Sequence, residues 1–180
     1  MIFSYQNKHP KMHKNVFVAR SADLIGDVEV GEDSSIWFGC VIRGDVNSIK
    51  IGKNTSIQDL SMVHVTHYTK EDKSDGHQTY IGDNVTIGHK VMLHGCTIGN
   101  ACLIGMSSTI LDGAIIGQES LVGAGSLVTQ NKIFPPRSLI MGSPAKVIRE
   151  LNDEEIESLY QSAKNYVKFK NSYLYHRTKN

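Results

Sequence analysis

Residues 97–130 read TIGNACLIGMSSTILDGAIIGQESLVGAGSLVTQ. A branched aliphatic residue occupies every sixth position of this stretch: Ile98, Ile104, Ile110, Ile116, Val122 and Val128. Neither the 3.6-residue period of an α-helix nor the two-residue alternation of a simple strand reproduces this spacing. A fixed short period of this kind is typical of a parallel β-helix built from hexapeptides.

The six-residue spacing also extends back toward the amino terminus, with interruptions. The earlier aliphatic positions are Val18, Leu24, Val30, Ile36, Ile42, Ile51, Ile57, Val63, Ile81, Ile87 and Leu93. The residue two positions before each aliphatic is usually small or β-branched, as Ser108 is before Ile110. Residues two apart in an extended segment face the same side, so each hexad sends one large and one small side chain inward. Three hexads that close one triangular coil predict a coil of eighteen residues.

Composition limits the class of protein. The 180 residues suffice for one domain, and a net charge of +1 with mixed signs gives no footprint for nucleic acid or an anionic membrane. No apolar run approaches the roughly 20 residues of a transmembrane helix. The amino-terminal residues lack a long apolar h-region, so we expect a cytoplasmic protein. Cys40, Cys96 and Cys102 occupy the small inward position and are predicted to be buried packing residues.

The pattern divides the chain into five segments. They are a polar lead-in at 1–14, the hexapeptide coils at 15–131, an exit segment at 132–151, a helix at 152–175 and a tail at 176–180. The helix prediction depends on Asn152 as the N-cap of an acidic first turn, followed by apolar residues at helical spacing. The sequence therefore predicts an all-β protein, a parallel β-helix of hexapeptide repeats, with a C-terminal α-helix.

Three irregularities interrupt the repeat. A short insertion lies between Ile42 and Ile51, a long polar excursion follows Val63, and Leu93 to Ile98 is one residue too short. Departures from a strict repeat are where functional residues are expected. All three flank the histidines of one group: His64, His89 and His94.

The repeat predicts where two of these histidines point. If the long excursion is an insertion within one hexad step, Val63 to Leu93 is one full coil. His64 and His94 then stack on one face, about 4.8 Å apart. The same count places Arg43 on that face, one coil below His64. Counting the excursion as three hexads would separate them, so this prediction depends on the first count.

His89 differs, because it lies two residues after Ile87 and should point away from His94. Nitrogen ligands lie about 2.0–2.1 Å from zinc, so three ligands must converge closely. One chain therefore supplies two ligands, and the third should come from a symmetry mate. The triangular prism favours three-fold packing. Taken singly, each histidine would more often have a surface or hydrogen-bonding role; the constellation favours a metal site.

These residues together resemble a known family. Arg43-Gly44-Asp45, Ser56-Ile57-Gln58-Asp59, Val63-His64 and Gly88-His89 through His94-Gly95-Cys96 are similar to motifs of the γ-class carbonic anhydrases. The similarity covers roughly residues 15–175 and is strongest to the bacterial γ-carbonic-anhydrase-like subgroup of the hexapeptide-repeat superfamily. It implies a left-handed β-helix and a homotrimer with zinc at each interface, bound by His64 and His94 of one subunit and His89 of the next. Iron(II) or cobalt could replace zinc.

The resemblance also implies roles for other residues. Arg43 and Asp59 would form an interfacial ion pair that Asp45 joins, while Gln58 would orient metal-bound solvent and Tyr166 would reach the site from the helix. The implied reaction is hydration of carbon dioxide to bicarbonate by a zinc-activated hydroxide.

The chain departs from the best-studied members of that family at three places. Val46 stands where they carry a glutamate, and Ser56 stands where they carry an asparagine. Residues 67–77 replace their acidic proton-shuttle loop. The level of activity is therefore left open.

Two other functions fit the sequence. Hexapeptide β-helices also host acetyl-CoA-dependent acyltransferases, in which one histidine acts as general base, and residues 142–146, Gly-Ser-Pro-Ala-Lys, resemble the exit motif of such enzymes. Three histidines in ligand register argue against this function. A non-catalytic metal-binding scaffold is the second alternative.

Overall fold

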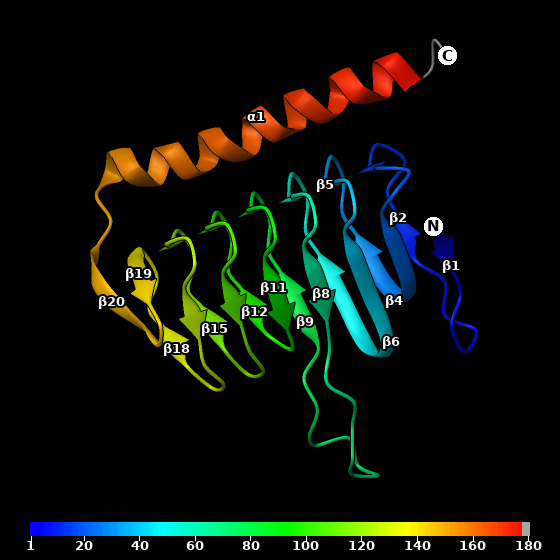
Figure 1. Ribbon diagram of the computed structural model, residues 1–180, viewed down its shortest axis with the longest axis horizontal. Coiled ribbons are helices and arrows are strands. Elements are labelled where there is room, and N and C mark those ends of the chain that lie inside the picture. Colours follow the sequence, from blue (N-terminus) through cyan, green and yellow to red (C-terminus); the bar gives the residue numbers. More distant parts are fainter. Residues whose placement is uncertain (178–180) are drawn as a thin grey trace.

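The hexads stack as the coils of a parallel β-solenoid in the computed structural model, which describes residues 1–177 (Figure 1). β13 (Leu103–Ile104) pairs in parallel with β16 (Leu121–Val122), and Leu103 lies opposite Leu121, eighteen residues later. The predicted coil length and the predicted fold class are therefore confirmed.

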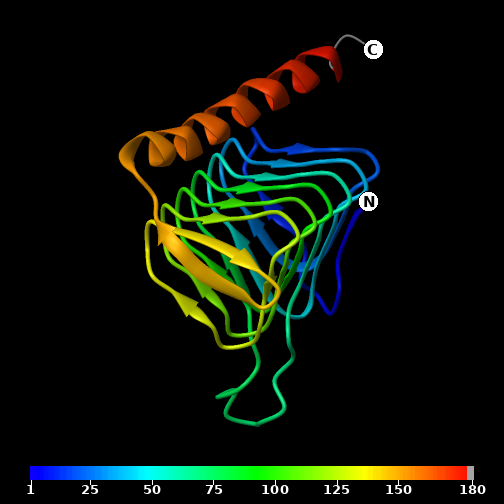
Figure 2. The same ribbon diagram turned by 60° about the vertical axis from the view of Figure 1, so that its left-hand side comes forward.

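The strands form three faces around a common interior (Figure 2). Face one holds the start of β4 (Asp23–Val30) and of β6 (Val41–Ile51), then β8 (Met62–His64), β11 (Met92–His94), β14 (Thr109–Ile110) and β17 (Leu127–Val128). Face two holds the ends of β4 and β6, then β9 (Thr79–Ile81), β12 (Thr97–Ile98), β15 (Ile115–Ile116) and β18 (Ile133–Phe134). Face three holds β3 (Phe17–Val18), β5 (Ser35–Ile36), β7 (Ser56–Ile57), β10 (Thr86–Ile87), β13, β16, β19 (Ser138–Gly142) and β20 (Ala145–Glu150). Two short strands, β1 (Ile2–Phe3) and β2 (Lys11–Met12), pair with β4.

The interior of the solenoid is filled as the repeat predicts. The large inward aliphatics, such as Ile104 and Ile110, are fully buried, and the small inward residues pack beside them. The buried Ser108 hydroxyl donates a hydrogen bond to the carbonyl of Gly123, so the core accommodates a polar side chain without leaving it unpaired.

All three cysteines are buried in this interior, as predicted. Burial raises the pKa of the Cys40 thiol to about 11 and the pKa of the Cys96 and Cys102 thiols to about 12. The neutral thiol is therefore the dominant form at pH 7, as expected of packing residues rather than nucleophiles.

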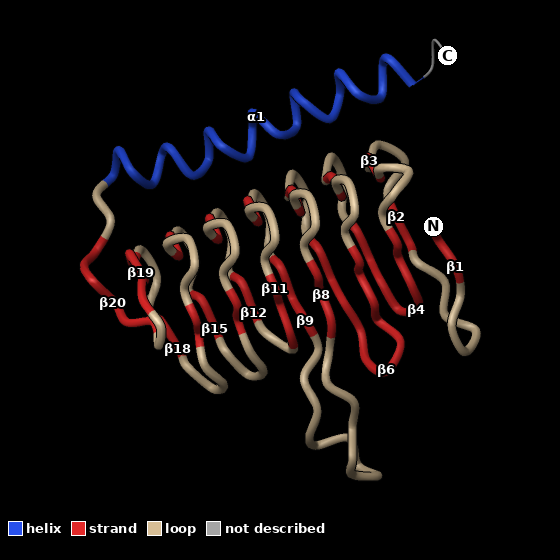
Figure 3. The backbone as a smooth tube through the Cα atoms, in the orientation of Figure 1, coloured by secondary structure: helices blue, strands red, loops and turns tan. Residues whose placement is uncertain are grey.

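The single helix, α1 (Asp153–Arg177), runs along the length of the solenoid and covers face three (Figure 3). Asn152 caps it: its side-chain oxygen accepts the Glu155 N–H at 2.8 Å, and Glu155 accepts the Asn152 N–H at 3.0 Å. This reciprocal capping box satisfies two backbone donors that the helix leaves open. The buried Lys170 ties the far end of α1 to the first coils through Asp33, at 2.6 Å. Residues 178–180 of the expected tail lie outside the described residues.

The solenoid continues beyond Asn131, where the sequence pattern had placed the end of the coils. β18 pairs in parallel with β15, and β19 pairs with β16. Phe134 and Ile140 keep the six-residue spacing after Val128 and are buried. The expected exit segment therefore contributes most of another coil before β20 turns back antiparallel to β19. Within residues 1–177, no helix has the length and apolar character needed to cross a membrane.

Adjacent residues of β15 test the inward packing. Ile116 is 0% exposed and Ile115 is 39% exposed. We expect Ile116→Ala to lower the free energy of unfolding by roughly 2–5 kcal/mol, because it leaves a cavity in a filled core. Ile115→Ala, the matched control, should change it by no more than about 0.5 kcal/mol. Urea unfolding followed by circular dichroism measures both, and equal losses would contradict the assigned register.

The capping box predicts a pH-dependent contribution of Glu155. Hydrogen bonds from Arg149 and from the Asn152 N–H lower the pKa of Glu155 to about 2. Because this pKa is lower in the folded chain, the stabilisation is complete above the ordinary value of 4.5 and is lost as the pH falls toward 2. Wild type and Glu155→Gln should therefore differ in unfolding free energy at pH 7 and converge near pH 2. Glu154→Gln, which removes the same charge without breaking the box, should give a smaller difference at pH 7.

Candidate metal centre

Parallel pairing places two of the three candidate histidines side by side on face one. β8 pairs with β11, and His64 lies opposite His94. On the other side of β8, Ile42 lies opposite Val63, which puts Arg43 next to the His64 column. The register that treats the long excursion as an insertion within one hexad step is therefore confirmed.

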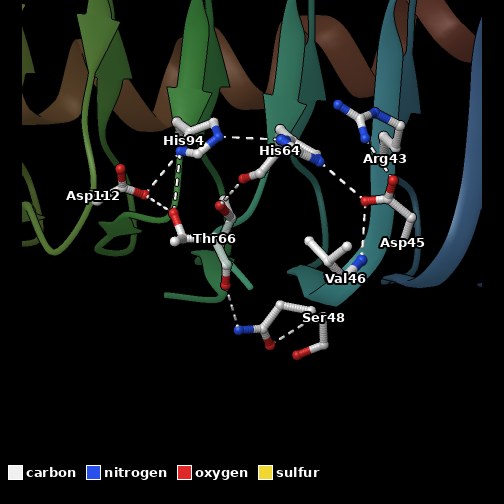
Figure 4. Close-up of polar contacts among 10 residues, drawn as sticks. Arg43, Asp45, Val46, Ser48, His64, Thr66, His94 and Asp112 are labelled. Atoms are coloured by element: carbon white, nitrogen blue, oxygen red, sulfur yellow. Dashed lines mark hydrogen bonds and ion pairs between the residues drawn. The ribbon is translucent and has the colours of Figure 1, made fainter. Parts of the chain in front are cut away.

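The rings of His64 and His94 meet in an edge arrangement, with one nitrogen of each ring directed at the other (Figure 4). Nδ1 of His64 lies 3.1 Å from Nε2 of His94, and the ring centroids are 5.1 Å apart. Two nitrogens bound to one tetrahedral zinc at 2.0–2.1 Å would lie about 3.3 Å apart. The histidine pair therefore fits two positions of a single metal ion with little movement.

The second nitrogen of each ring is held by an aspartate. His64 Nε2 lies 3.0 Å from Asp45 Oδ1, and His94 Nδ1 lies 2.8 Å from Asp112 Oδ1. Arg43 donates to the other oxygen of Asp45 at 2.5 Å. Metal-binding imidazoles commonly donate their second N–H to a carboxylate, which fixes the ring orientation. The pair is thus supported as metal ligands usually are.

The local electrostatics favour the neutral imidazole at His64. Burial lowers the pKa of His64, and the positive charge of Arg43 acts in the same direction, against the opposing effect of Asp45. Burial raises the pKa of Asp45, but hydrogen bonds from His64 and Arg43 outweigh it and hold the pKa below its usual value. A neutral ring beside an ionised carboxylate is the form that binds a cation.

His89 belongs to a different group of residues. Its Nδ1 lies 2.9 Å from Asp59 Oδ2, so this ring too is held by an aspartate and keeps Nε2 for another partner. His89 lines a groove on the solenoid together with Gln58, which directly follows β7, and Tyr166, which belongs to α1. Burial and the nearby charge of Asp59 raise the pKa of Tyr166, while a hydrogen bond with Gln58 opposes them.

The chain therefore brings the candidate residues together as two half-sites. We name Arg43, Asp45, His64 and His94 the histidine-pair half-site, and Gln58, Asp59, His89 and Tyr166 the His89 half-site. Within the described part of the chain, no group of three or more His, Cys, Asp or Glu side chains is arranged to hold a metal ion. Arg43 pairs with Asp45 and Asp59 pairs with His89 in the single chain, so the expected Arg43–Asp59 ion pair stays a prediction about an assembly.

The three irregularities of the repeat meet near the histidine-pair half-site. The long excursion, residues 65–78, projects on the side opposite α1 (Figures 1 and 2). Asn47 of the short insertion donates to the Thr66 carbonyl at 3.1 Å and accepts from the Tyr68 hydroxyl at 3.1 Å. Gly95, at the deletion, adopts a positive φ of 54° beside Asp112 and His77.

Sequence reasoning missed Thr66 and Asp112. Thr66 donates a hydrogen bond to Asp112, which in turn contacts His94. The strict repeat did not predict Asp112, because this coil is one residue short: Leu93 lies opposite Ile110, seventeen residues later, so Asp112 stands one position beyond the register of His94. No signal pointed to Thr66, because its position depends on how the excursion folds.

The chain is similar to hexapeptide-repeat proteins and to proteins named carbonic anhydrase. Residues 95–130 match the family described as bacterial transferase hexapeptide (six repeats). The chain is 42% identical to a carbonic anhydrase of Geobacillus kaustophilus, over 93% of this chain and 87% of that protein. It is 47% identical to the mitochondrial gamma carbonic anhydrase 2 of Arabidopsis thaliana, over 89% of this chain. The chain belongs to the γ-class carbonic anhydrase family.

The family includes longer chains and proteins with other names. This chain spans 57% of the length of the Arabidopsis protein. A solved structure of a hexapeptide transferase family protein from Anaplasma phagocytophilum superposes with a TM-score of 0.87 at 40% identity, covering 96% of this chain and 97% of that one. Family membership confirms the resemblance seen in the motifs, and both carbonic anhydrase and transferase names occur among the relatives.

Proposed function

We propose that this protein is a zinc-dependent carbonic anhydrase, a lyase, that hydrates carbon dioxide reversibly to bicarbonate at the interfaces of a homotrimer. The observation that carries the proposal is the 3.1 Å separation of the facing nitrogens of His64 and His94, with His89 held on a different part of the same chain. Relatives named carbonic anhydrase over most of this chain support the reaction.

The donor set supports zinc as the ion. Three neutral imidazoles with an open fourth position are the ligands of catalytic zinc in other carbonic anhydrases. Iron(II) and cobalt(II) accept the same nitrogen donors, so the donor set alone does not discriminate among the three ions.

The division into two half-sites supports an assembly. The histidine-pair half-site has two ligands and lacks a third, while the His89 half-site offers one imidazole with a free nitrogen. Three-fold packing of the prisms would bring His89 of one subunit to His64 and His94 of the next. The same packing would bring Asp59 to Arg43 of the neighbour.

The chain's own residues have separable tasks in this reaction. A bound zinc ion supplies a water molecule acidified to a pKa near 7 and an electrophilic centre. Asp45 and Asp59 hold the rings of His64 and His89 in fixed orientations. The buried amide of Gln58 positions solvent and the developing bicarbonate. Its neighbour Tyr166 has a raised pKa and remains a hydrogen-bond donor at neutral pH.

An acetyl-CoA-dependent acyltransferase is the second candidate. A groove of about 450 Å³ lies between α1 and face three, and its lining includes His89 and the glycine-rich edges of β13 and β16. Such a groove could hold an extended cofactor, with His89 as general base. The His64–His94 pair has no task in that reaction, which is why we prefer the carbonic anhydrase.

Metal content and activity test the proposal together. Protein purified without oxygen should contain about one zinc, iron or cobalt ion per chain, and His94→Ala should lose it, because removing one of three ligands weakens the site. Stopped-flow hydration of carbon dioxide, set against metal content, measures the activity. A chain that binds no metal under any reconstitution would overturn the proposal. Bound metal without hydration would identify a scaffold, and saturable acetyl-CoA binding would favour the transferase.

Mixed oligomers test whether the site is shared between chains. Chains carrying His89→Ala keep an intact histidine pair, and chains carrying His94→Ala keep an intact His89. Refolding the two variants together should restore metal binding at the interfaces where these intact halves meet. The matched control mixes His64→Ala with His94→Ala, in which every chain has a defective pair, and should restore nothing. Equal metal recovery in both mixtures would rule out a shared site.

A further inference from the structure

His94 also contacts Asp112, a residue that belongs to neither half-site. Asp112 approaches the ring on the Nδ1 side at 2.8 Å, while Nε2 faces His64 at 3.1 Å (Figure 4). A carboxylate that accepts from Nδ1 keeps the proton on that nitrogen. The Nε2 lone pair is then directed toward His64, into the space where the two rings converge.

Asp112 is itself held in place. The Thr66 hydroxyl donates to the same oxygen, Oδ1, and Gln130 lies 3.5 Å from Oδ2. The Asp112 side chain is largely buried, with 18% of its surface exposed. A carboxylate fixed from two sides can fix the imidazole in turn, whereas a freely rotating one could not.

Thr66 forms an antiparallel β-bridge with His77 at the base of the excursion. Its N–H donates to the His77 carbonyl at 2.9 Å, and its carbonyl accepts the His77 N–H at 3.2 Å. This pair of hydrogen bonds closes the base of the excursion and fixes the Thr66 side chain against Asp112. The base of the excursion is thereby connected to His94 through two side chains.

The deletion in the repeat makes room for this contact. At Gly95, a Cβ atom would collide with Asp112 Oδ1 and would lie 2.7 Å from the Cβ of His77. Met92 pairs with Thr109, seventeen residues later, so this coil is one residue shorter than the regular coil. The short coil and the glycine therefore let Asp112 reach the ring of His94.

We infer that Thr66 and Asp112 are a positioning pair that fixes the orientation and tautomer of the His94 ring, so that the fold of the excursion sets the metal affinity of the site. The inference rests on the proposed function in one respect: it takes His94 to be a metal ligand. The orientation of the ring is a property of the metal-free chain and can be measured separately.

Zinc affinity of three variants tests the pair. In competition with a chromophoric chelator, Asp112→Ala should weaken zinc binding about 10- to 100-fold, as loss of an outer carboxylate does elsewhere. Asp112→Asn should weaken zinc binding less than Asp112→Ala does, because the amide oxygen of asparagine still accepts a hydrogen bond from Nδ1 of His94. Thr66→Val keeps the shape of the side chain and removes its hydroxyl. It should weaken zinc binding about fivefold, as expected for the loss of one hydrogen bond. Asp83→Ala, whose carboxylate accepts the Lys53 N–H away from both half-sites, is the matched control and should bind as wild type does.

The tautomer of His94 gives a readout that a merely structural role would not change. In metal-free wild type, ¹⁵N nuclear magnetic resonance should show Nδ1 protonated and Nε2 unprotonated. Asp112→Ala should shift His94 toward a mixture of tautomers, with the circular dichroism of the folded chain retained. If that variant does not fold, Asp112→Asn and Thr66→Val decide the question by the same two measurements.

The outcomes separate the two proposals. Unchanged zinc affinity and an unchanged His94 tautomer in the folded variants would overturn the positioning role, even if the wild type is an active carbonic anhydrase. A wild type that binds no metal would overturn the proposed function. In that case the tautomer measurement would still decide whether Asp112 orients the ring.

Discussion

Parallel pairing between successive coils is the interaction on which the rest of the molecule depends. Each coil donates backbone hydrogen bonds to the next, as Gly105 N does to the Val122 carbonyl at 2.7 Å. The inward aliphatics fix the register, because a slip of one residue would turn every buried side chain outward. The same register fixes the positions of the outward-facing residues. His64 and His94 are adjacent because Val63 and Leu93 are both buried and paired.

The site arises where the repeat is locally broken. In a regular repeat, side chains at equivalent positions of successive coils stack above one another. Additional residues can approach such a stack laterally only where the repeat is interrupted. The short insertion supplies Asp45 and Asn47, and the excursion supplies Thr66. The deletion at Gly95 admits Asp112. The regular coils provide rigid positions for the rings, and the three irregularities provide the side chains that orient them.

The sequence predicted what depends on period and missed what depends on the path of an insertion. The hexads predicted the solenoid, the His64–His94 register and the burial of the cysteines, and Asn152 with Glu155 marked the start of the helix. The end of the coils was placed too early because Pro135 and Pro136 looked like a stop, although Phe134 and Ile140 keep the spacing on either side of them. The contact of Thr66 with Asp112 joins residues 46 positions apart across a polar excursion without any period, so no pattern could predict it.

The same physical arrangement recurs at each candidate ligand. His64, His89 and His94 each have one ring nitrogen held by an aspartate, from Asp45, Asp59 and Asp112 respectively. In the proposed trimer, each ring is oriented by its own chain before the subunits meet, so assembly and metal binding need little rearrangement of side chains. A ligand that binds only the assembled state stabilises that state by mass action. Metal binding and subunit association would therefore strengthen each other in that trimer, and rings oriented in advance would let a site divided between two chains bind one ion tightly.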